Sequence, residues 1–136
     1  MGWQARSVSD PMIHHVSLGT NDLARAKAFY DAVMPHLGVR LIKASERIVA
    51  YGLTAVAFSL ERPSDGKPAT AGNGTHIAFD AGHRNTVDEF YKAGLANGGK
   101  GEGAPGIRAE YDRHYYAAFL RDPDGNKIEI VTFAAD

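Results

Sequence analysis

An internal repeat limits the folds open to this chain more than any other feature of its sequence. At an offset of 61 residues, His15 superposes on His76. The same offset aligns further pairs: Val16 with Ile77, Leu18 with Phe79, Phe29-Tyr30 with Phe90-Tyr91, and Gly38 with Gly99. Self-similarity over a fixed period indicates repeated structural units. We therefore expect two modules related by a pseudo-two-fold axis, with the two histidines as neighbours in space.

Each copy is expected to fold in the order βαβββ, which makes the chain an α+β protein with two curved sheets forming a cup. Apolar residues at helical spacing begin at Leu23 and at Val87. Pro35 is expected to end the first helix early. Residues 98–113 contain five glycines and one proline, and we expect a long mobile loop there. Short strands are expected at 13–18, 39–43, 47–51, 55–60, 75–80, 115–121 and 127–133.

The last two strands are expected to form a hairpin around Pro123-Asp124-Gly125. Proline presets the first turn residue and glycine takes the left-handed position, so Asp122 and Asp124 are expected to serve only as turn formers. In this register Phe119 lies opposite Glu129. The strand alternation then turns Ile128 and Ile130 toward the helices, and turns Glu129 toward the cup together with the residues Tyr115, Ala117 and Phe119.

Length and composition are those of one compact unit of 136 residues, with modules at 11–62 and 75–133 joined by a connection at 63–74. The absence of cysteine excludes disulfides, thiolate zinc sites and cysteine nucleophiles. A net charge of −1 gives no reason to expect nucleic acid or an anionic membrane as a partner. The apolar stretch 48–60 is too short to span a bilayer, and residues 1–7 lack a signal-peptide core. We therefore expect a cytoplasmic protein.

His15, His76 and Glu129 are the candidate metal ligands. Two imidazoles and one carboxylate bind a divalent transition metal and leave one face of it open. Iron, manganese, nickel, cobalt and zinc all fit this set, which does not choose between them. A small substrate with two adjacent oxygens can chelate through the open positions, with oxygenation expected for iron and Lewis-acid chemistry for the others.

Four further residues are candidates for contact with the substrate. Tyr115 is the expected phenol near the substrate, as a hydrogen-bond donor or proton shuttle. A one-residue slip of the hairpin would put Tyr116 in its place. Ser17 is expected to point inward, two residues after His15, and Arg108 is expected to bind an anionic substrate group.

Three segments resemble the signatures of the vicinal oxygen chelate superfamily, over about residues 11–133. They are His14-His15-Val16-Ser17-Leu18 with the following Asp22-Leu23 and Phe29-Tyr30, then Thr75-His76-Ile77-Ala78-Phe79, and last the segment from Asp122 to Glu129. The superfamily includes glyoxalase I, fosfomycin-resistance proteins, extradiol dioxygenases and bleomycin-resistance proteins. The resemblance implies the two-module βαβββ cup, and it places His15, His76 and Glu129 on the family's metal positions.

The resemblance also implies a homodimer in which His15 serves a site whose other ligands come from the partner subunit. Glyoxalase I adds a fourth ligand from the last strand of the first module, where this chain has Phe58 or a neighbour, and Glu61 would need a shifted register. The three-ligand set fits dioxygenation, or addition of a thiol or water, better than it fits glyoxalase isomerisation. Glyoxalase-like lyase activity remains an alternative if Glu61 or a water completes the site. The alternative is a metal-free binding or sequestration protein of the bleomycin-resistance type.

Overall fold

The computed structural model describes residues 11–136. The N-terminal residues in which we expect no signal peptide lie outside this range. Within residues 11–136, no helix combines the length and the apolar character needed to cross a membrane.

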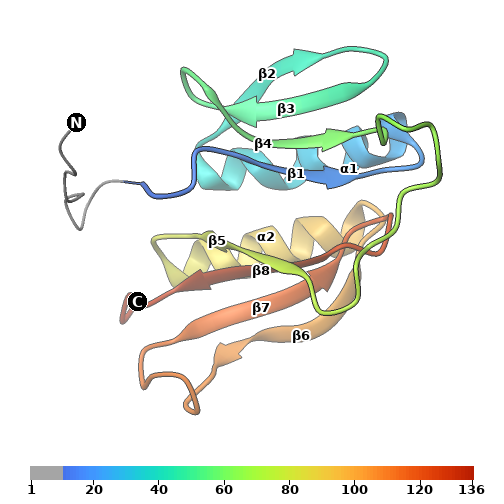
Figure 1. The fold of residues 1–136 in the computed structure, drawn as a ribbon. Helices are drawn as coiled ribbons and strands as arrows, with labels where there is room; N and C mark the ends of the chain where they lie inside the picture. The colour runs from blue at the N-terminus through green and yellow to red at the C-terminus, as the bar shows by residue number, and fades with distance from the viewer. Residues whose placement is uncertain (1–10) are drawn as a thin grey trace, which may run out of the picture.

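Two four-stranded sheets, one from each half of the chain, make up the fold (Figure 1). The first sheet has the order β1-β4-β3-β2, with β1 at Val16–Gly19, β2 at Arg40–Ala44, β3 at Ile48–Gly52 and β4 at Val56–Glu61. The second has the order β5-β8-β7-β6, with β5 at His76–Asp80, β6 at Lys100–Ile107, β7 at Tyr116–Arg121 and β8 at Lys127–Thr132. Both halves follow the βαβββ order, so the predicted fold class is confirmed.

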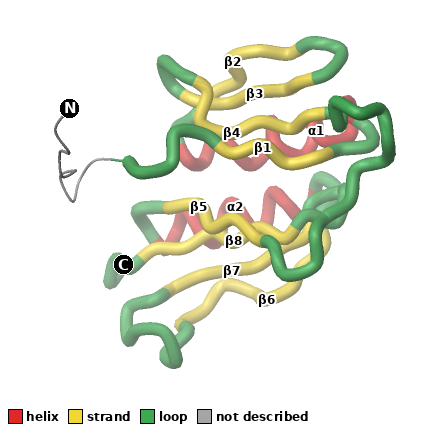
Figure 2. Tube along the Cα trace, viewed as in Figure 1, coloured by secondary structure: helices red, strands yellow, loops and turns green. Residues whose placement is uncertain are grey.

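One helix of each module covers its sheet, α1 at Leu23–Val33 and α2 at Arg84–Ala96. In Figure 2 both helices lie on the same side of the two sheets. The Asp22 carboxylate caps α1 by accepting a hydrogen bond from the Arg25 backbone N–H at 3.0 Å. Pro35 lies in a 3-10 turn, Met34–Leu37, that follows α1 directly, so the helix ends where the sequence predicts.

The two modules share one hydrophobic core. Helices α1 and α2 contact each other, and the fully buried side chains of both sheets meet below them. A chain of aromatic contacts crosses the boundary between the modules. The ring centroids of Tyr30 and Phe58 are 5.0 Å apart, those of Phe58 and Phe79 are 5.2 Å apart, and those of Phe79 and Phe90 are 6.2 Å apart.

The prediction of a mobile loop over residues 98–113 is wrong for half of its length, because Lys100–Ile107 forms β6. Strand β6 pairs with β7, with two register shifts between Gly101 and Gly106. Glycine is needed here for close approach: a Cβ added at Gly101 would clash with the Tyr91 hydroxyl oxygen. In a sequence, glycine that makes room for a neighbour looks the same as glycine that allows motion.

The same close packing predicts a stability loss for Gly99→Ala. The added Cβ would lie 2.7 Å from Phe29 Cε2 and 2.8 Å from the Gly94 carbonyl oxygen, and the latter is backbone that cannot turn aside. We expect the free energy of unfolding in urea to fall by about 1–3 kcal/mol. Gly106→Ala is the matched control. Among the described residues, its Cβ would lie close only to the flexible end of Arg108, at 3.2 Å from Nη1. Equal losses in the two variants would contradict this account.

The β7–β8 hairpin has the predicted geometry. The Asp122 N–H donates to the Asn126 carbonyl oxygen at 2.9 Å, and Gly125 adopts a φ of 87°. Phe119 is the register partner of Glu129, as the three-residue loop predicts.

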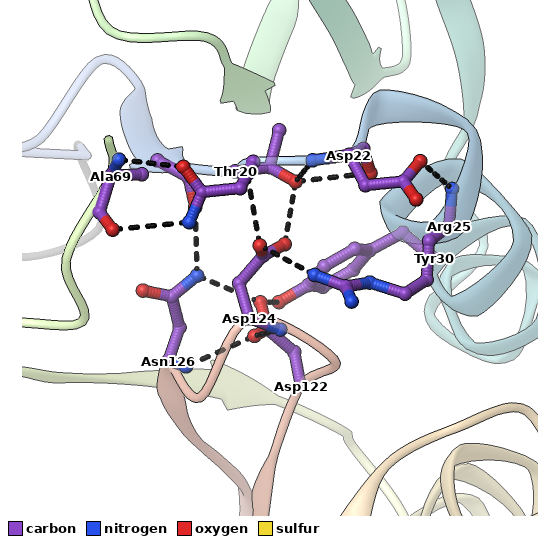
Figure 3. A network of polar contacts seen from close by, with 10 residues as sticks. Thr20, Asp22, Arg25, Tyr30, Ala69, Asp122, Asp124 and Asn126 are labelled. Atoms are coloured by element: carbon purple, nitrogen blue, oxygen red, sulfur yellow. Dashed lines mark hydrogen bonds and ion pairs between the residues drawn. The ribbon is translucent and has the colours of Figure 1, made fainter. Parts of the chain in front are cut away.

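Asp124, however, does more than form the turn. Its carboxylate accepts hydrogen bonds from the Thr20 hydroxyl at 2.5 Å, the Asn21 backbone N–H at 2.9 Å and the Arg25 guanidinium at 2.9 Å. Figure 3 shows this carboxylate between Thr20 and Arg25. The tip of the second-module hairpin is therefore tied to the segment that begins α1 in the first module.

Asp122 extends this network into the protein interior (Figure 3). It accepts hydrogen bonds from the Tyr30 hydroxyl at 2.7 Å and from the Asn126 side-chain amide at 3.0 Å, and the same amide donates to the Gly19 carbonyl oxygen at 3.1 Å. Burial raises the pKa of the Tyr30 phenol well above its usual value, and the neighbouring Asp122 raises it further. The phenol is therefore a hydrogen-bond donor at neutral pH. The expectation that both aspartates only form the turn is wrong, because turn chemistry does not reveal partners about a hundred residues away.

Candidate functional site

His76 and Glu129 meet on the second sheet. His76 is the first residue of β5, and Glu129 lies on β8 next to Ala78 of β5. The His76 Nε2 atom lies 3.1 Å from Glu129 Oε1. The Glu129 side chain is 3% exposed and the His76 ring 43% exposed, so a deeply buried carboxylate reaches a ring that faces solvent. Buried charges in proteins are normally paired or coordinate a metal.

Tyr115 fixes the second oxygen of this carboxylate. Its hydroxyl donates to Glu129 Oε2, while Oε1 faces His76. Burial and the neighbouring Glu129 raise the pKa of the Tyr115 phenol to about 12, so it stays protonated at neutral pH. Its ring packs against Tyr111 and Phe133, with centroids 5.0 and 5.2 Å away. Tyr115 therefore orients the carboxylate that it touches.

His76, Tyr115 and Glu129 line one cavity of about 600 Å³. Phe119 also lines it, with its ring centroid 6.4 Å from that of His76. The size is that of a small-molecule site. The lining residues are His76, Glu102, Gly103, Arg108, Tyr111, Tyr115, Phe119, Lys127 and Glu129.

Tyr116 lies on the opposite face of the second sheet from this cavity. Its hydroxyl donates to Asp88 of α2 at 2.5 Å, and the Arg84 guanidinium lies 5.0 Å from the centre of its ring. The hairpin register that puts Phe119 opposite Glu129 turns Tyr115 toward the cavity and Tyr116 toward the helix. Arg108, in contrast, lines the cavity, where the sequence analysis expects an anion-binding residue.

On the first sheet, Ser17, Ser59 and Glu61 form a second polar cluster. The Ser17 hydroxyl donates to Glu61 Oε2 at 2.7 Å and lies 2.8 Å from the Ser59 hydroxyl. The inward orientation expected for Ser17 brings it to a carboxylate. Strands β1 and β4 pair without interruption from Val16–Phe58 to Gly19–Glu61, so Glu61 reaches this face without the shifted register that the sequence analysis requires.

The repeat shows which first-module residue corresponds to Glu129. Ser17 is equivalent to Ala78, and the β4 partner of Ser17 is Ser59, just as the β8 partner of Ala78 is Glu129. Ser59 thus takes the place of the carboxylate, with Glu61 at the next inward position of the same strand. Phe58, which the sequence analysis considers for this place, is 4% exposed and packs in the core.

His15 does not join His76 within one chain. It directly precedes β1, and its Nδ1 atom lies 2.8 Å from Nδ1 of His14. In Figure 1, β1 and β5 run in opposite directions, so the beginnings of the two strands lie at opposite ends of the molecule. Over residues 11–136, no three side chains of His, Cys, Asp or Glu are grouped closely enough to hold a metal ion. The expected neighbourhood of the two histidines is therefore not found in a single chain.

Lys127 is a cavity residue that was not among the candidates from the sequence. It is the β8 partner of His76 and lines the same cavity. Strand alternation contains the signal, because Lys127 is two residues before Glu129 and must face the same way. A lysine beside a turn is easily taken for a solvated charge, which is why this signal is overlooked.

Comparison with known proteins identifies the fold family. The family model of the "Glyoxalase/Bleomycin resistance protein/Dioxygenase superfamily" matches residues 12–130. A glyoxalase/bleomycin resistance protein from Albidiferax ferrireducens T118 is similar in structure, with 41% identity and a TM-score of 0.80 over 89% of this chain and 98% of that one. A search of curated proteins found no match.

More distant structures share the fold. A glyoxalase/bleomycin resistance protein/dioxygenase family enzyme from Burkholderia phytofirmans PsJN has 21% identity and a TM-score of 0.71, over 90% of this chain and 98% of that one. A lactoylglutathione lyase from Agrobacterium tumefaciens has 23% identity and a TM-score of 0.64, over 90% and 94%. The paired βαβββ modules and the match over nearly the whole length agree: the chain belongs to the glyoxalase/bleomycin resistance protein/dioxygenase superfamily.

Proposed function

We propose that this protein is a divalent-metal-dependent enzyme that acts on a small, oxygen-rich substrate. The observation that carries the proposal is the pairing of His76 Nε2 with the buried Glu129 Oε1 at 3.1 Å, in a cavity of about 600 Å³. Metal–nitrogen and metal–oxygen bonds are about 2.0–2.2 Å long, so two donors at a near right angle on one ion lie about 3 Å apart. The separation and the chemistry of the pair both fit adjacent ligands.

Two donors are too few for a stable site, and we propose that a second copy of the chain supplies the rest. The family's members often form dimers. In a symmetric dimer, His15 of one subunit would complete the His76–Glu129 pair of the other, and each dimer would hold two equivalent sites. Glu61 faces the same side of its sheet as Ser17, so it is available as a fourth donor. The proposed ligand set is therefore compatible with three alternative reaction classes: glyoxalase-like lyase, dioxygenase-like and transferase-like.

The residues around the pair have definite roles in this proposal. A bound divalent transition metal would supply Lewis-acid stabilisation of negative charge that develops on a substrate oxygen. Tyr115 holds the Glu129 carboxylate in place through its hydroxyl and keeps its proton at neutral pH. Phe119 and Arg108 form the wall against which the substrate binds. The half-exposed His76 ring leaves the pair open to the cavity.

Elemental analysis of protein purified without chelators or an affinity metal column tests this proposal. We expect about one transition metal per chain, lost in His76→Ala/Glu129→Ala. The matched control is His36→Ala/Glu46→Ala, which removes the same residue types from exposed positions outside the cavity and should keep the metal. Wild-type protein that carries no metal, and takes none up on reconstitution, would contradict the proposal.

That contradicting result would favour the second candidate function, a metal-free binding or sequestration protein of the bleomycin-resistance type. Two observations favour it. One chain already forms a cavity of about 600 Å³ with an aromatic wall, and within residues 11–136 no three metal-binding side chains are grouped together.

A further inference from the structure

Two cations of the candidate cavity lie against the ring of Phe119. The Arg108 guanidinium carbon is 5.6 Å from the ring centroid, and the Lys127 ammonium nitrogen is 5.4 Å from it. Because both distances are measured to the same centroid, the charged groups of Arg108 and Lys127 are separated by at most their sum. Both residues are half-buried. Partial burial of two positive charges in one small space is costly unless something negative faces them.

Among the described residues neither cation forms an ion pair within 4.0 Å, although Glu102, which is hydrogen-bonded to Arg121, lies within electrostatic reach of Lys127. The two acids that line the cavity are already engaged: Glu129 with His76 and Tyr115, and Glu102 with Arg121 at 2.9 Å. Among residues 11–136, the one hydrogen bond of the Arg108 side chain goes to the Ala104 carbonyl oxygen, at 2.8 Å. Most of the guanidinium N–H donors remain available to a ligand.

The backbone of β6 is shaped around the guanidinium. A Cβ added at Gly103 would lie 3.1 Å from Arg108 Nη2, and one added at Gly106 would lie 3.2 Å from Nη1. Both contacts are tighter than a Cβ normally makes, so glycine at these two places lets the guanidinium lie close to the strand. Together with the hydrogen bond to the Ala104 carbonyl oxygen, these contacts place the guanidinium against the strand.

The cations lie beside the proposed metal pair. Lys127 is the β5–β8 partner of His76, and Phe119 is the β7–β8 partner of Glu129. A small molecule whose oxygens face His76 and Glu129 would therefore extend along Phe119 toward Arg108 and Lys127. Arginine binds carboxylates and phosphates with two parallel hydrogen bonds, and lysine adds a compact charge.

From this arrangement we infer that the substrate carries an anionic oxygen group, a carboxylate or a phosphate, which Arg108 and Lys127 bind beside Phe119. The inference rests on the proposed function, since it assigns the charge of the substrate taken by the same site. It adds Lys127 as a specificity-determining residue and predicts that neutral analogues bind weakly.

Calorimetric titration at low ionic strength tests the inference on full-length protein freed of metal by a chelator. The probes are succinate, inorganic phosphate and the neutral succinamide. We expect succinate or phosphate to bind and succinamide not to bind, and the stronger of the two anions identifies the group. Arg108→Gln/Lys127→Gln should weaken anion binding by about 10-fold or more, since hydrogen bonds between charged groups are the strong ones.

The control removes two positive charges from another cavity. Arg47→Gln/Arg62→Gln alters a separate cavity of about 550 Å³ and should leave succinate and phosphate affinity unchanged. Near-ultraviolet circular dichroism checks the fold, and the single variants Arg108→Gln and Lys127→Gln stand in if the double variant does not fold. Absence of anion binding in wild-type protein, or equal binding in Arg108→Gln/Lys127→Gln, would overturn the inference.

The metal proposal is tested separately in the same set of proteins. Arg108→Gln/Lys127→Gln should keep its metal, because neither side chain is one of the proposed ligands His15, His76 and Glu129. Wild-type protein that binds the anion but no metal would contradict the metal proposal alone, and wild-type protein that binds metal but no anion would contradict this inference alone.

Discussion

Replacing Asp124 with alanine is expected to lower the free energy of unfolding by about 2–4 kcal/mol, because the change leaves three donors without their acceptor. Asp124 is 3% exposed at its side chain and accepts from Thr20, Asn21 and Arg25. The Thr20 residue is fully buried, so its hydroxyl cannot turn to water when the carboxylate is removed and keeps only the longer hydrogen bond to the Asp22 carbonyl oxygen, at 3.1 Å. Arg25 is half exposed and regains hydration, which limits the loss. Equilibrium unfolding in urea measures the change.

Asp65→Ala is the matched control for this prediction. Within the described part of the chain, its carboxylate accepts only from the backbone N–H of Lys67, two residues away, at 2.9 Å and at an exposed position. We expect a change within about 0.5 kcal/mol, as for ordinary surface substitutions. If Asp124→Ala cost no more than this control, the hairpin would not be a significant tie between the two modules.

The features that the sequence predicts correctly are those set by local chemistry or by the repeat. The helical spacing from Leu23 and the βαβββ order both follow from periodic patterns. The register that puts Phe119 opposite Glu129 follows from the Pro-Asp-Gly loop, because a hairpin fixes its register through its turn. These predictions need no knowledge of how distant segments pack.

The features that the sequence does not predict depend on such packing. The repeat shows that His15 and His76 are equivalent, but symmetry does not make equivalent residues neighbours, and a two-fold relation puts the beginnings of β1 and β5 at opposite ends. The partners of Asp122 and Asp124 are likewise set by the packing of one module on the other. The glycines of β6 are understood only once Tyr91 and Arg108 are seen against them.

The division of the metal site between two subunits is the central claim of this account, and mixed dimers test it most directly. His15→Ala chains and Glu129→Ala chains, each with its own affinity tag, are combined, and the heterodimer is isolated with both tags. In a shared site, the intact His15 of one chain meets the intact His76 and Glu129 of the other. We therefore expect one complete site in the heterodimer where neither parent homodimer has any.

The control combines His76→Ala chains with Glu129→Ala chains. Both changes fall in the same half of the site, so every site in this heterodimer lacks a ligand. The measurement is the metal content of the purified heterodimers by elemental analysis. The account predicts about one metal per His15→Ala/Glu129→Ala heterodimer, half the wild-type content, and none in the control. A heterodimer that recovers no more metal than the control would contradict a site shared between subunits.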